Sequence, residues 1–339
     1  MDETALPIIA TVPARAALAG NPSDGYGGAV FAVPVPACSA AARLDSIDRG
    51  YELVDVQSGL SRYESWADLE QAMASATAAS PHCLLLGVIA EIAERSGQLA
   101  PFRLAADTTI PVSVGLAGSS AIVIAALRVL IGWAGDAIDN DELAVTALNI
   151  ETRRIGIAAG LQDRVVQAYG QPMLMQFDPE STQSGPGVFT PVRAAGAMRL
   201  FVASRASTSK PSQIVHGDLR ARFDSRDQTV TDAMPILANR AVDAAAAFTA
   251  ADVVRLGAAM DATFDTRASI LDLARSHVEM VEAARAAGAH ANFTGSGGSV
   301  VVLARSADVE AAARQSLNKL GCIIVSIDTA LPDAEPGAG

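Results

Sequence analysis

The chain has 339 residues, of which half are hydrophobic and 18% are charged, so it is globular and long enough for one large domain or two ordinary ones. Its formal net charge of −12 repels nucleic acid and anionic lipid, so neither a nucleic acid nor a membrane is expected as a partner. An anionic substrate would need a local positive site. Arginine is the residue type that can supply it, because only two of the 25 basic residues are lysines.

The cysteines and the apolar segments indicate where the protein acts. Cys38, Cys83 and Cys322 are scattered and show neither metal-ligand spacing nor a disulfide framework, as expected in a reducing compartment. The N-terminal segment "MDETALPIIA" is acidic and lacks the basic region of a secretory signal. The longest apolar run, residues 121–133, is short and carries Arg128, so it does not predict a membrane span. We expect a cytoplasmic protein, either a monomer or a homodimer.

Apolar periodicity and turn residues predict strands that alternate with helices in the first half of the chain. The glycine-rich segment "GNPSDGYGG" is predicted to be a loop between the first two strands. The helix that begins at Asp139 has acidic residues in its first turn, as the helix dipole favours. In chain order we expect strands at 8–12 and 29–36, helices at 64–77 and 81–97, a strand at 102–111, helices up to Trp133, at 139–156 and at 159–170, and a strand at 172–178.

The second half of the chain continues the same alternation. Residues 179–196 are rich in Pro, Gly, Ser and Thr and mark the expected domain boundary, which gives domains at 1–190 and 191–330 and a disordered tail at 331–339. The pattern is typical of α/β or α+β proteins. The expected elements are a strand at 197–205, helices at 228–248 and 266–287, a loop and strand at 290–304, a helix at 308–321 and a strand from Cys322.

The segment "TTIPVSVGLAGSSAIVIAALRVL", Thr108–Leu130, places glycines and serines directly before an apolar helix. Glycines allow several backbone N–H groups to point at one place, and the helix N-terminus adds its own free N–H groups and positive dipole end. Such an arrangement suits phosphates. It is not a Walker A loop, because no lysine follows Gly118. On its own, the segment could equally be a glycine-rich turn capped by Ser119 or Ser120.

Three segments together resemble the GHMP kinase superfamily, which includes galactokinase, homoserine kinase and mevalonate kinase. Pro111–Ala121 resembles the motif of Pro, a short spacer and G-L-x-S-S-A, and "VPARAALAGNPSDGYGG" resembles the N-terminal motif. "TGSGGSVVVLA" is similar to the C-terminal glycine loop, so the resemblance runs from about Val12 to Ile327. It implies a two-domain α+β fold with a ribosomal S5 domain 2-like N-terminal domain and a ferredoxin-like C-terminal domain.

Within the superfamily the sequence is most similar to glucuronokinases, in "GLAGSSAIV", "GNPSDGYGG", "GIAAGLQDRVVQAYG" and "VHGDLRARF". That resemblance implies ATP-dependent phosphorylation of a sugar at its anomeric hydroxyl, with D-glucuronate as the expected substrate. The alternatives are a kinase for a heptose phosphate, fucose, arabinose or galacturonate. A further alternative is a catalytically silent homologue that senses ATP and a sugar.

The resemblance also implies roles for individual residues, with ATP and Mg²⁺ as cofactors. Asp163 would be the catalytic base and Arg15 would keep it ionised and offset developing charge. Ser120 and Glu151 would meet the metal; Glu151 lies twelve positions before Asp163, as in galactokinases. From the residues alone, Asp163 is more simply an N-cap. The nucleotide phosphates would be cradled by Gly115, Leu116, Ala117, Gly118, Ser119, Ser120 and Ala121.

The substrate residues follow from the same resemblance and from the chemistry of a uronate. Asn21 and Pro22 stand where galactokinases have Glu-His, so galactose is not expected. A carboxylate calls for an arginine; Arg220 and Arg222 would share one face of a strand, although each arginine alone reads as an exposed salt bridge. The expected substrate-binding residues are Asn21, Asp24, Tyr26, Arg164, Arg220, Arg222, Gly295, Ser296 and Gly297.

Overall fold

The structure is a computed structural model, and it describes residues 7–177, 186–205 and 212–329. The chain folds into two compact units. Unit 1 comprises Met1–Ala14, Cys38–Ile110 and Ala117–Gly170, and unit 2 comprises Arg15–Ala37, Pro111–Leu116 and Gln171–Gly339. The domain boundary near residue 190 stays a prediction, and the expected tail at 331–339 lies outside the described residues.

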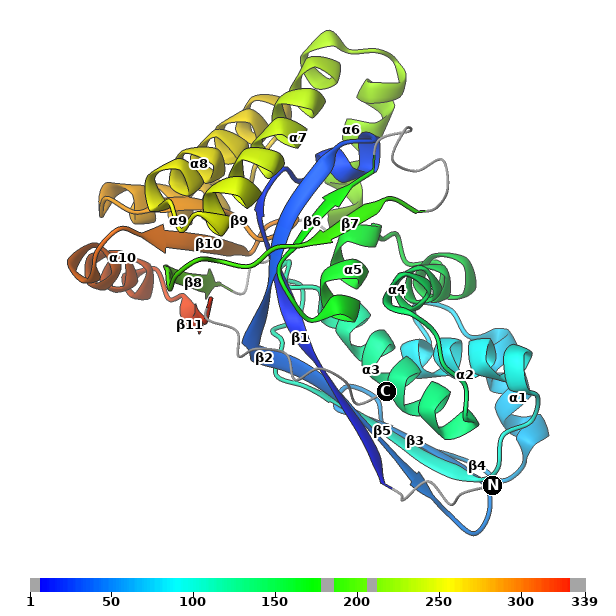
Figure 1. Cartoon of the computed structure of the whole chain (residues 1–339). Coiled ribbons are helices and arrows are strands. Elements are labelled where there is room, and N and C mark those ends of the chain that lie inside the picture. Colours follow the sequence, from blue (N-terminus) through cyan, green and yellow to red (C-terminus); the bar gives the residue numbers. More distant parts are fainter. Residues whose placement is uncertain (1–6, 178–185, 206–211, 330–339) are drawn as a thin grey trace. The chain divides into compact units, whose positions relative to one another are not determined.

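Unit 1 is a sheet with its helices along one face (Figure 1). The strand order is β4-β3-β5-β2, in which β3 and β5 are parallel and the other neighbours are antiparallel. β1 pairs with β2, and both strands continue into unit 2. The strands are β1 (Ile8–Ala19), β2 (Ala29–Ser46), β3 (Tyr51–Asp55), β4 (Gly59–Tyr63) and β5 (Phe102–Thr108). The helices are α1 (Trp66–Ser75), α2 (Cys83–Ser96), α3 (Gly118–Ala134), α4 (Asn140–Asn149) and α5 (Leu161–Tyr169), with the π-helical turn η2 (Ile150–Ile155) between the last two.

Capping residues and burial explain the helices of unit 1. Ser65 and Asp68 form a capping box at the start of α1, and the Asp139 side chain accepts from the N–H of Glu142 at the start of α4. α3 is apolar on nearly all sides because it lies inside the unit, where ten of its residues are buried. Gly135 ends α3 in the left-handed conformation, with φ of 70°.

Unit 2 contains a four-stranded antiparallel sheet in the order β11-β8-β10-β9. When the four strands are numbered in chain order, they lie in the order 4-1-3-2. This is the strand order of a ferredoxin-like domain, as predicted. β6 (Met173–Gln176) pairs with β2 and with β7 (Val188–Pro191). The remaining elements are η1 (Ser23–Tyr26), β8 (Arg199–Ser204), α6 (Ser212–Asp224), α7 (Gln228–Thr249), α8 (Val253–Ile270), α9 (Arg275–Ala286), β9 (His290–Phe293), β10 (Ser299–Ala304), α10 (Ala307–Lys319) and β11 (Ile323–Ile327).

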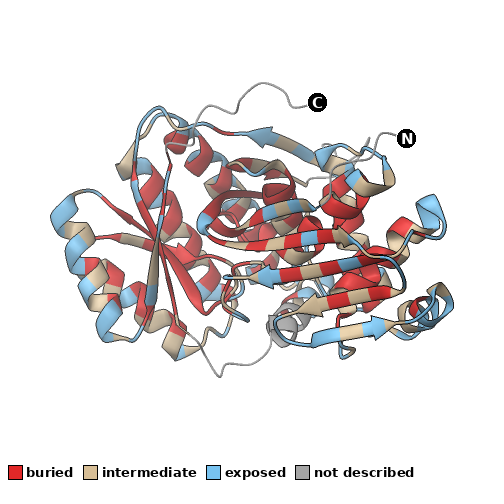
Figure 2. Cartoon of the chain, turned by 90° about the horizontal axis from the view of Figure 1, so that it is seen from below, coloured by how far each residue is buried: buried red, intermediate tan, exposed pale blue. Residues whose placement is uncertain are grey.

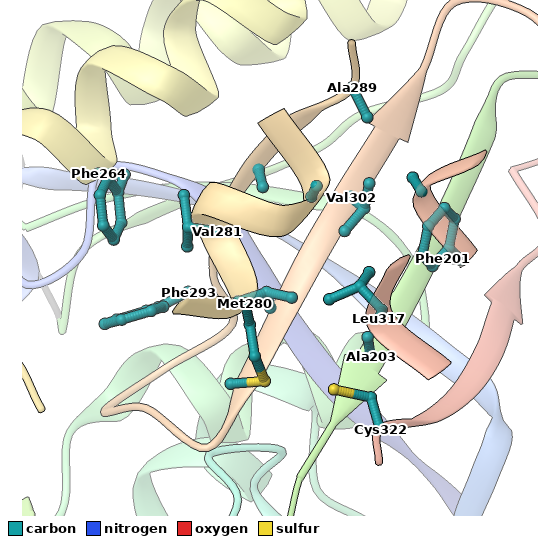
Figure 3. Packing of buried hydrophobic residues seen from close by; sticks show 14 residues of the cluster. Phe201, Ala203, Phe264, Met280, Val281, Ala289, Phe293, Val302, Leu317 and Cys322 are labelled. Carbon is teal, nitrogen blue, oxygen red and sulfur yellow. The ribbon is translucent and has the colours of Figure 1, made fainter. Parts of the chain in front are cut away.

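The core of unit 2 lies between its four-stranded sheet and the helices packed on it (Figure 3). Met280 and Val281 of α9 meet Phe201 of β8 and Val302 of β10 in one buried cluster. Buried residues lie on most strands and on the helix faces that meet them, while exposed residues lie on the outer helix faces and on parts of the sheets such as β4 and β7 (Figure 2). Among the described residues, no helix has the length and apolar character needed to cross a bilayer.

The α+β class is confirmed, but several predicted elements were wrong. Residues 266–287 form the end of α8 and the whole of α9, separated by an extended break at Leu271. The break persists because Leu271 packs against a buried cluster and Arg222 Nη1 donates to the Ile270 carbonyl at 2.6 Å. Residues 215–223 lie in helix α6 rather than in a strand, so Arg220 and Arg222 point in different directions. The short strands β3, β4 and β7 were missed.

Candidate functional site

In unit 1, the glycine- and serine-rich loop leads into α3 without a side-chain cap. Ala117, the N-cap residue, is left-handed with φ of 61° and makes no side-chain cap hydrogen bond. The Ser120 hydroxyl instead donates to the Ala117 carbonyl at 3.2 Å. The first N–H groups of α3 and its positive dipole end are therefore available to an anion. The alternative of a turn capped by Ser119 or Ser120 is wrong.

Glu151 lies in the π-helical turn after α4 and is completely buried. Its Oε1 accepts a hydrogen bond from Ser119 Oγ at 2.8 Å. Its Oε2 accepts from Arg164, from Nε at 2.9 Å and from Nη2. The structure thus brings Glu151 together with Ser119, whereas the resemblance pairs it with Ser120.

The oxygen atoms around Glu151 can be tested as ligands for Mg²⁺. Carboxylate and hydroxyl oxygens are the donors that this hard cation prefers. Oε1 and the serine hydroxyl are of that type, while Oε2 is already bound by Arg164. Among the described residues, no group of three or more His, Cys, Asp or Glu side chains could hold a metal alone. The residues therefore fit an ion whose other ligands come from nucleotide phosphates.

The start of α5 positions Asp163 and Arg164. The N-cap of α5 is Gly160, so the alternative in which Asp163 is the N-cap is wrong. Asp163 lies in the first turn, where the helix dipole stabilises a carboxylate, and its side chain is 21% exposed. Arg164 is buried and donates to the Gly160 carbonyl at 2.6 Å as well as to Glu151. The Arg164 guanidinium thus has protein partners at Nε, Nη1 and Nη2, and its predicted role in substrate binding stays a prediction.

Gln167, one turn after Asp163, is a buried residue that the sequence did not single out. Its Nε2 donates to the Ala117 carbonyl at 2.8 Å and to the Pro13 carbonyl at 3.2 Å. These bonds tie α5 to the residue that precedes α3 and to β1. A glutamine inside an amphipathic helix carries no distinct sequence signal, and only the fold reveals this role.

In unit 2, backbone contacts join parts of all three motifs. The N–H of Arg15 donates to the Leu116 carbonyl at 3.2 Å, and Arg15 Nη1 donates to the Thr294 carbonyl. The Thr294 hydroxyl donates to the Gly115 carbonyl at 3.0 Å. Arg15, the glycine loop before α3 and the C-terminal glycine loop therefore meet within this unit.

The C-terminal glycine loop packs too closely for side chains. A Cβ on Gly295 would lie 2.7 Å from the Gly115 carbonyl oxygen and 3.3 Å from Arg15 Nη1. Gly297 has φ of 128°, and a Cβ there would lie 2.5 Å from the His277 ring. The glycines are thus required by close approach of backbone and arginine, and Ser296 lies between them.

Arg267 on α8 is a second residue that the sequence did not reveal. Its Nη2 donates to the Gly295 carbonyl at 2.8 Å, and only 2% of the residue is exposed. Burial lowers the pKa of Arg267 to about 10, an effect that Asp24 opposes and Arg15 strengthens. The guanidinium therefore stays charged at neutral pH and feels the charges of both residues.

The remaining predicted substrate residues lie around η1 and α6. The Arg220 guanidinium donates to the Gly25 carbonyl and lies 4.5 Å from the centre of the Tyr26 ring. Tyr26 packs on Phe223 at 4.6 Å between ring centres, and burial raises the pKa of its hydroxyl. Asn21, just before η1, is buried.

The Arg222 side chain bonds to two other parts of unit 2. Its Nε donates to Asp227 at 2.9 Å, in addition to the bond from Nη1 to the end of α8.

Residues 84–171 match the N-terminal domain of the GHMP kinases, a range that contains the start of α3, Glu151 and Asp163. Solved structures with the same fold include the mevalonate kinase of Methanococcus jannaschii, with a TM-score of 0.75 and 15% identity over 95% of this chain and 98% of that one. The galactokinase of Lactococcus lactis, solved with galactose, has a TM-score of 0.76 and 17% identity over 94% of this chain and 93% of that one. The chain has the GHMP kinase fold.

Among curated proteins, the chain is similar to two proteins of Arabidopsis thaliana. It is 38% identical over 210 residues to probable glucuronokinase 2, covering 59% of this chain and 56% of that protein. It is 36% identical over 211 residues to glucuronokinase 1, covering 60% and 57%. The chain thus spans just over half the length of the curated relatives it matches. The predicted resemblance to GHMP kinases, and to glucuronokinases among them, is confirmed.

Proposed function

We propose that the protein is an ATP-dependent sugar kinase that phosphorylates the anomeric hydroxyl of D-glucuronate. The observation that carries the proposal is the uncapped start of α3 with the buried Glu151 carboxylate hydrogen-bonded to Ser119. A helix N-terminus without a cap offers N–H groups to phosphate oxygens, and a carboxylate beside a hydroxyl offers oxygen ligands. The similarity to glucuronokinases supports the choice of sugar.

In the proposed reaction, the protein positions the reactants and stabilises charge. The N–H groups at the start of α3 bind the nucleotide phosphates. Ser119 and Glu151 would hold Mg²⁺, which would neutralise charge on the phosphates. Arg164 fixes the Glu151 carboxylate through two hydrogen bonds and so keeps its other oxygen directed to Ser119.

Asp163 is the proposed base that accepts or orients the proton of the sugar hydroxyl. Asp163 lies in the first turn of α5. Arg15 is proposed to offset negative charge that develops during transfer. Its place on β1 is fixed by hydrogen bonds to Leu116 and Thr294.

A panel of sugars tests the substrate. With ATP and Mg²⁺, we expect glucuronate to be phosphorylated with a kcat/KM about 100-fold above that of glucose, because a buried arginine without its carboxylate disfavours the neutral sugar. The measurement is ADP release for glucuronate, galacturonate, glucose, fucose, arabinose and a heptose phosphate, with the anomeric phosphate identified by phosphorus NMR. If another sugar has a higher kcat/KM than glucuronate, that sugar is the substrate instead. If no sugar is turned over, the remaining candidate is a catalytically silent homologue that senses ATP and a sugar.

Two serine variants test the metal ligands. Ser119→Ala removes the hydroxyl that faces Glu151, so we expect it to raise the Mg²⁺ concentration for half-maximal rate about 10-fold or more. Ser120→Ala breaks a bond to the Ala117 carbonyl, and a smaller shift is expected if that bond is only structural. The readout is the initial rate as a function of Mg²⁺ at fixed ATP. A larger shift in Ser120→Ala would restore Ser120 as the metal ligand, as the family resemblance implies.

A further inference from the structure

Arg267 has hydrogen-bonding capacity that the protein itself leaves unused. Among the described residues, only Nη2 has a hydrogen-bond partner, the Gly295 carbonyl at 2.8 Å. Nε and Nη1 have no hydrogen-bond partner among the described residues, although the side chain is buried. These two nitrogens carry three of the five N–H donors of a guanidinium. Buried donors without partners are costly, so a partner supplied by binding would relieve that cost.

Helix α8, which carries Arg267, contacts both the N-terminal motif and the C-terminal glycine loop. Thr263 lies one turn earlier on α8, and its hydroxyl accepts from the N–H of Gly20 at 3.4 Å. Arg267 contacts Gly295, so one face of α8 reaches both loops. The ring of Phe293 lies 5.3 Å from the guanidinium carbon and covers it with an aromatic face. Arg267 therefore lies on the face of α8 that contacts both loops within unit 2.

The charges and polar groups nearby favour a singly charged ligand that also carries hydroxyls. Asp24 is close enough to act on Arg267 electrostatically, and its negative charge disfavours a multiply charged phosphate more than a single carboxylate. Asn21 is 3% exposed, and its Oδ1 has no hydrogen-bond partner within the described part of the chain. It can accept a hydrogen bond from a sugar hydroxyl without adding negative charge.

The other candidate arginines are committed elsewhere. Arg164 is bound to Glu151 and Gly160, and Arg222 is bound to Asp227 and to the end of α8. Arg220 is exposed and stacks on Tyr26. None of them combines burial with unused donors in the way that Arg267 does.

We propose that Arg267 binds the carboxylate of a uronate substrate and sets the preference of the site for a uronate over a neutral sugar. The inference rests on the proposed function as a sugar kinase. The planar guanidinium suits a carboxylate, and its charge-assisted bonds are stronger than neutral ones. A neutral sugar would leave the same donors unpaired.

The test compares D-glucuronate with D-glucuronamide, a neutral analogue of nearly the same shape. Dissociation constants are measured by calorimetry without nucleotide, so the result does not depend on phosphoryl transfer. For the wild type we expect glucuronate to bind about 10- to 100-fold more tightly. Arg267→Gln should reduce this ratio to about threefold or less, mainly through loss of glucuronate affinity. Arg267→Lys, which keeps the charge but loses the planar fork, should give an intermediate ratio.

A matched control is Arg285→Gln. Arg285 also lies over an aromatic ring, that of Phe264 at 5.0 Å, and also donates to a backbone carbonyl, that of Asp261. It should keep the wild-type ratio. If Arg267→Gln does not fold, an unchanged ratio in Arg267→Lys overturns the proposal.

Three further results would also overturn it: no wild-type preference for glucuronate, an unchanged preference in Arg267→Gln, or an equal loss of both ligands. The last would show that Arg267 only supports the Gly295 loop. A raised KM for ATP with an intact sugar preference would assign the arginine to phosphate instead. The two proposals can fail separately. If no sugar is phosphorylated but Arg267→Gln still loses the preference for glucuronate over glucuronamide, the Arg267 inference stands and the kinase proposal fails.

Discussion

Asp163→Asn should lower kcat by about 100- to 10,000-fold and leave the fold intact, because it removes a proposed general base while keeping its shape. The side chain is at the start of α5 and 21% exposed, and its neighbour Arg164 keeps its bonds to Glu151 and Gly160 in the variant, so we expect the fold to tolerate a neutral amide there. The KM values for ATP and sugar should change less than kcat, because the interaction is made mainly in the transition state. The measurement is steady-state kinetics on protein with an unchanged thermal unfolding midpoint.

Asp308→Asn is the matched control for that experiment. Asp308 is likewise an aspartate in the first turn of a helix, at the start of α10. It should lose the same favourable interaction with a helix dipole without a change in kcat. If both variants turn over at nearly the wild-type rate, the base is another residue, and the spacing between Glu151 and Asp163 has no catalytic meaning.

Sequence reasoning located the motif residues because their spacing is local. The family resemblance assigned Ser120 and Glu151 to one metal ion, whereas in the structure the hydroxyl that meets the carboxylate is that of Ser119, 32 positions before Glu151. Which serine faces the carboxylate depends on how α3 begins. Ala117 in a left-handed conformation turns Ser119 towards Glu151 and Ser120 back to the loop. The sequence G-S-S-A does not determine at which residue the helix begins, and a shift of one residue changes which serine faces Glu151.

The arginines show where sequence reasoning fails. Arg220 and Arg222 were expected on a strand, but their segment is helical, and packing decides such short segments. Arg267 could not be found, because its partner Gly295 lies 28 positions away and nothing in "DATFDTRASI" differs from an ordinary amphipathic helix. Burial without full hydrogen bonding is a property of the folded chain alone.

The ion pair between Glu151 and Arg164 should make removal of either partner strongly destabilising. Both side chains are almost fully buried, at 0% and 3% exposure. Arg164→Met leaves the carboxylate buried with one serine hydroxyl, and Glu151→Leu leaves the guanidinium with only the more distant and partly exposed Asp163 carboxylate, 3.6 Å away, as counter-charge. Each single change should cost about 3–5 kcal/mol, whereas the double variant should recover most of that loss because no unpaired charge remains. Urea unfolding of the four proteins gives the coupling energy, and an Arg164→Met protein as stable as the wild type would contradict the expectation.

The double variant also separates stability from catalysis. If the ion pair serves only the fold, a well-folded Glu151→Leu/Arg164→Met protein should turn over normally. We expect instead that it remains at least about 100-fold less active, because it lacks the carboxylate proposed to bind Mg²⁺ with the nucleotide phosphates. Arg164→Gln, assayed below its unfolding temperature, is the informative comparison. It keeps Glu151 but no longer fixes its orientation, so it should lose Mg²⁺ affinity more than maximal rate. Full activity in the folded double variant would remove Glu151 from the mechanism and leave the ion pair as a purely structural element of unit 1.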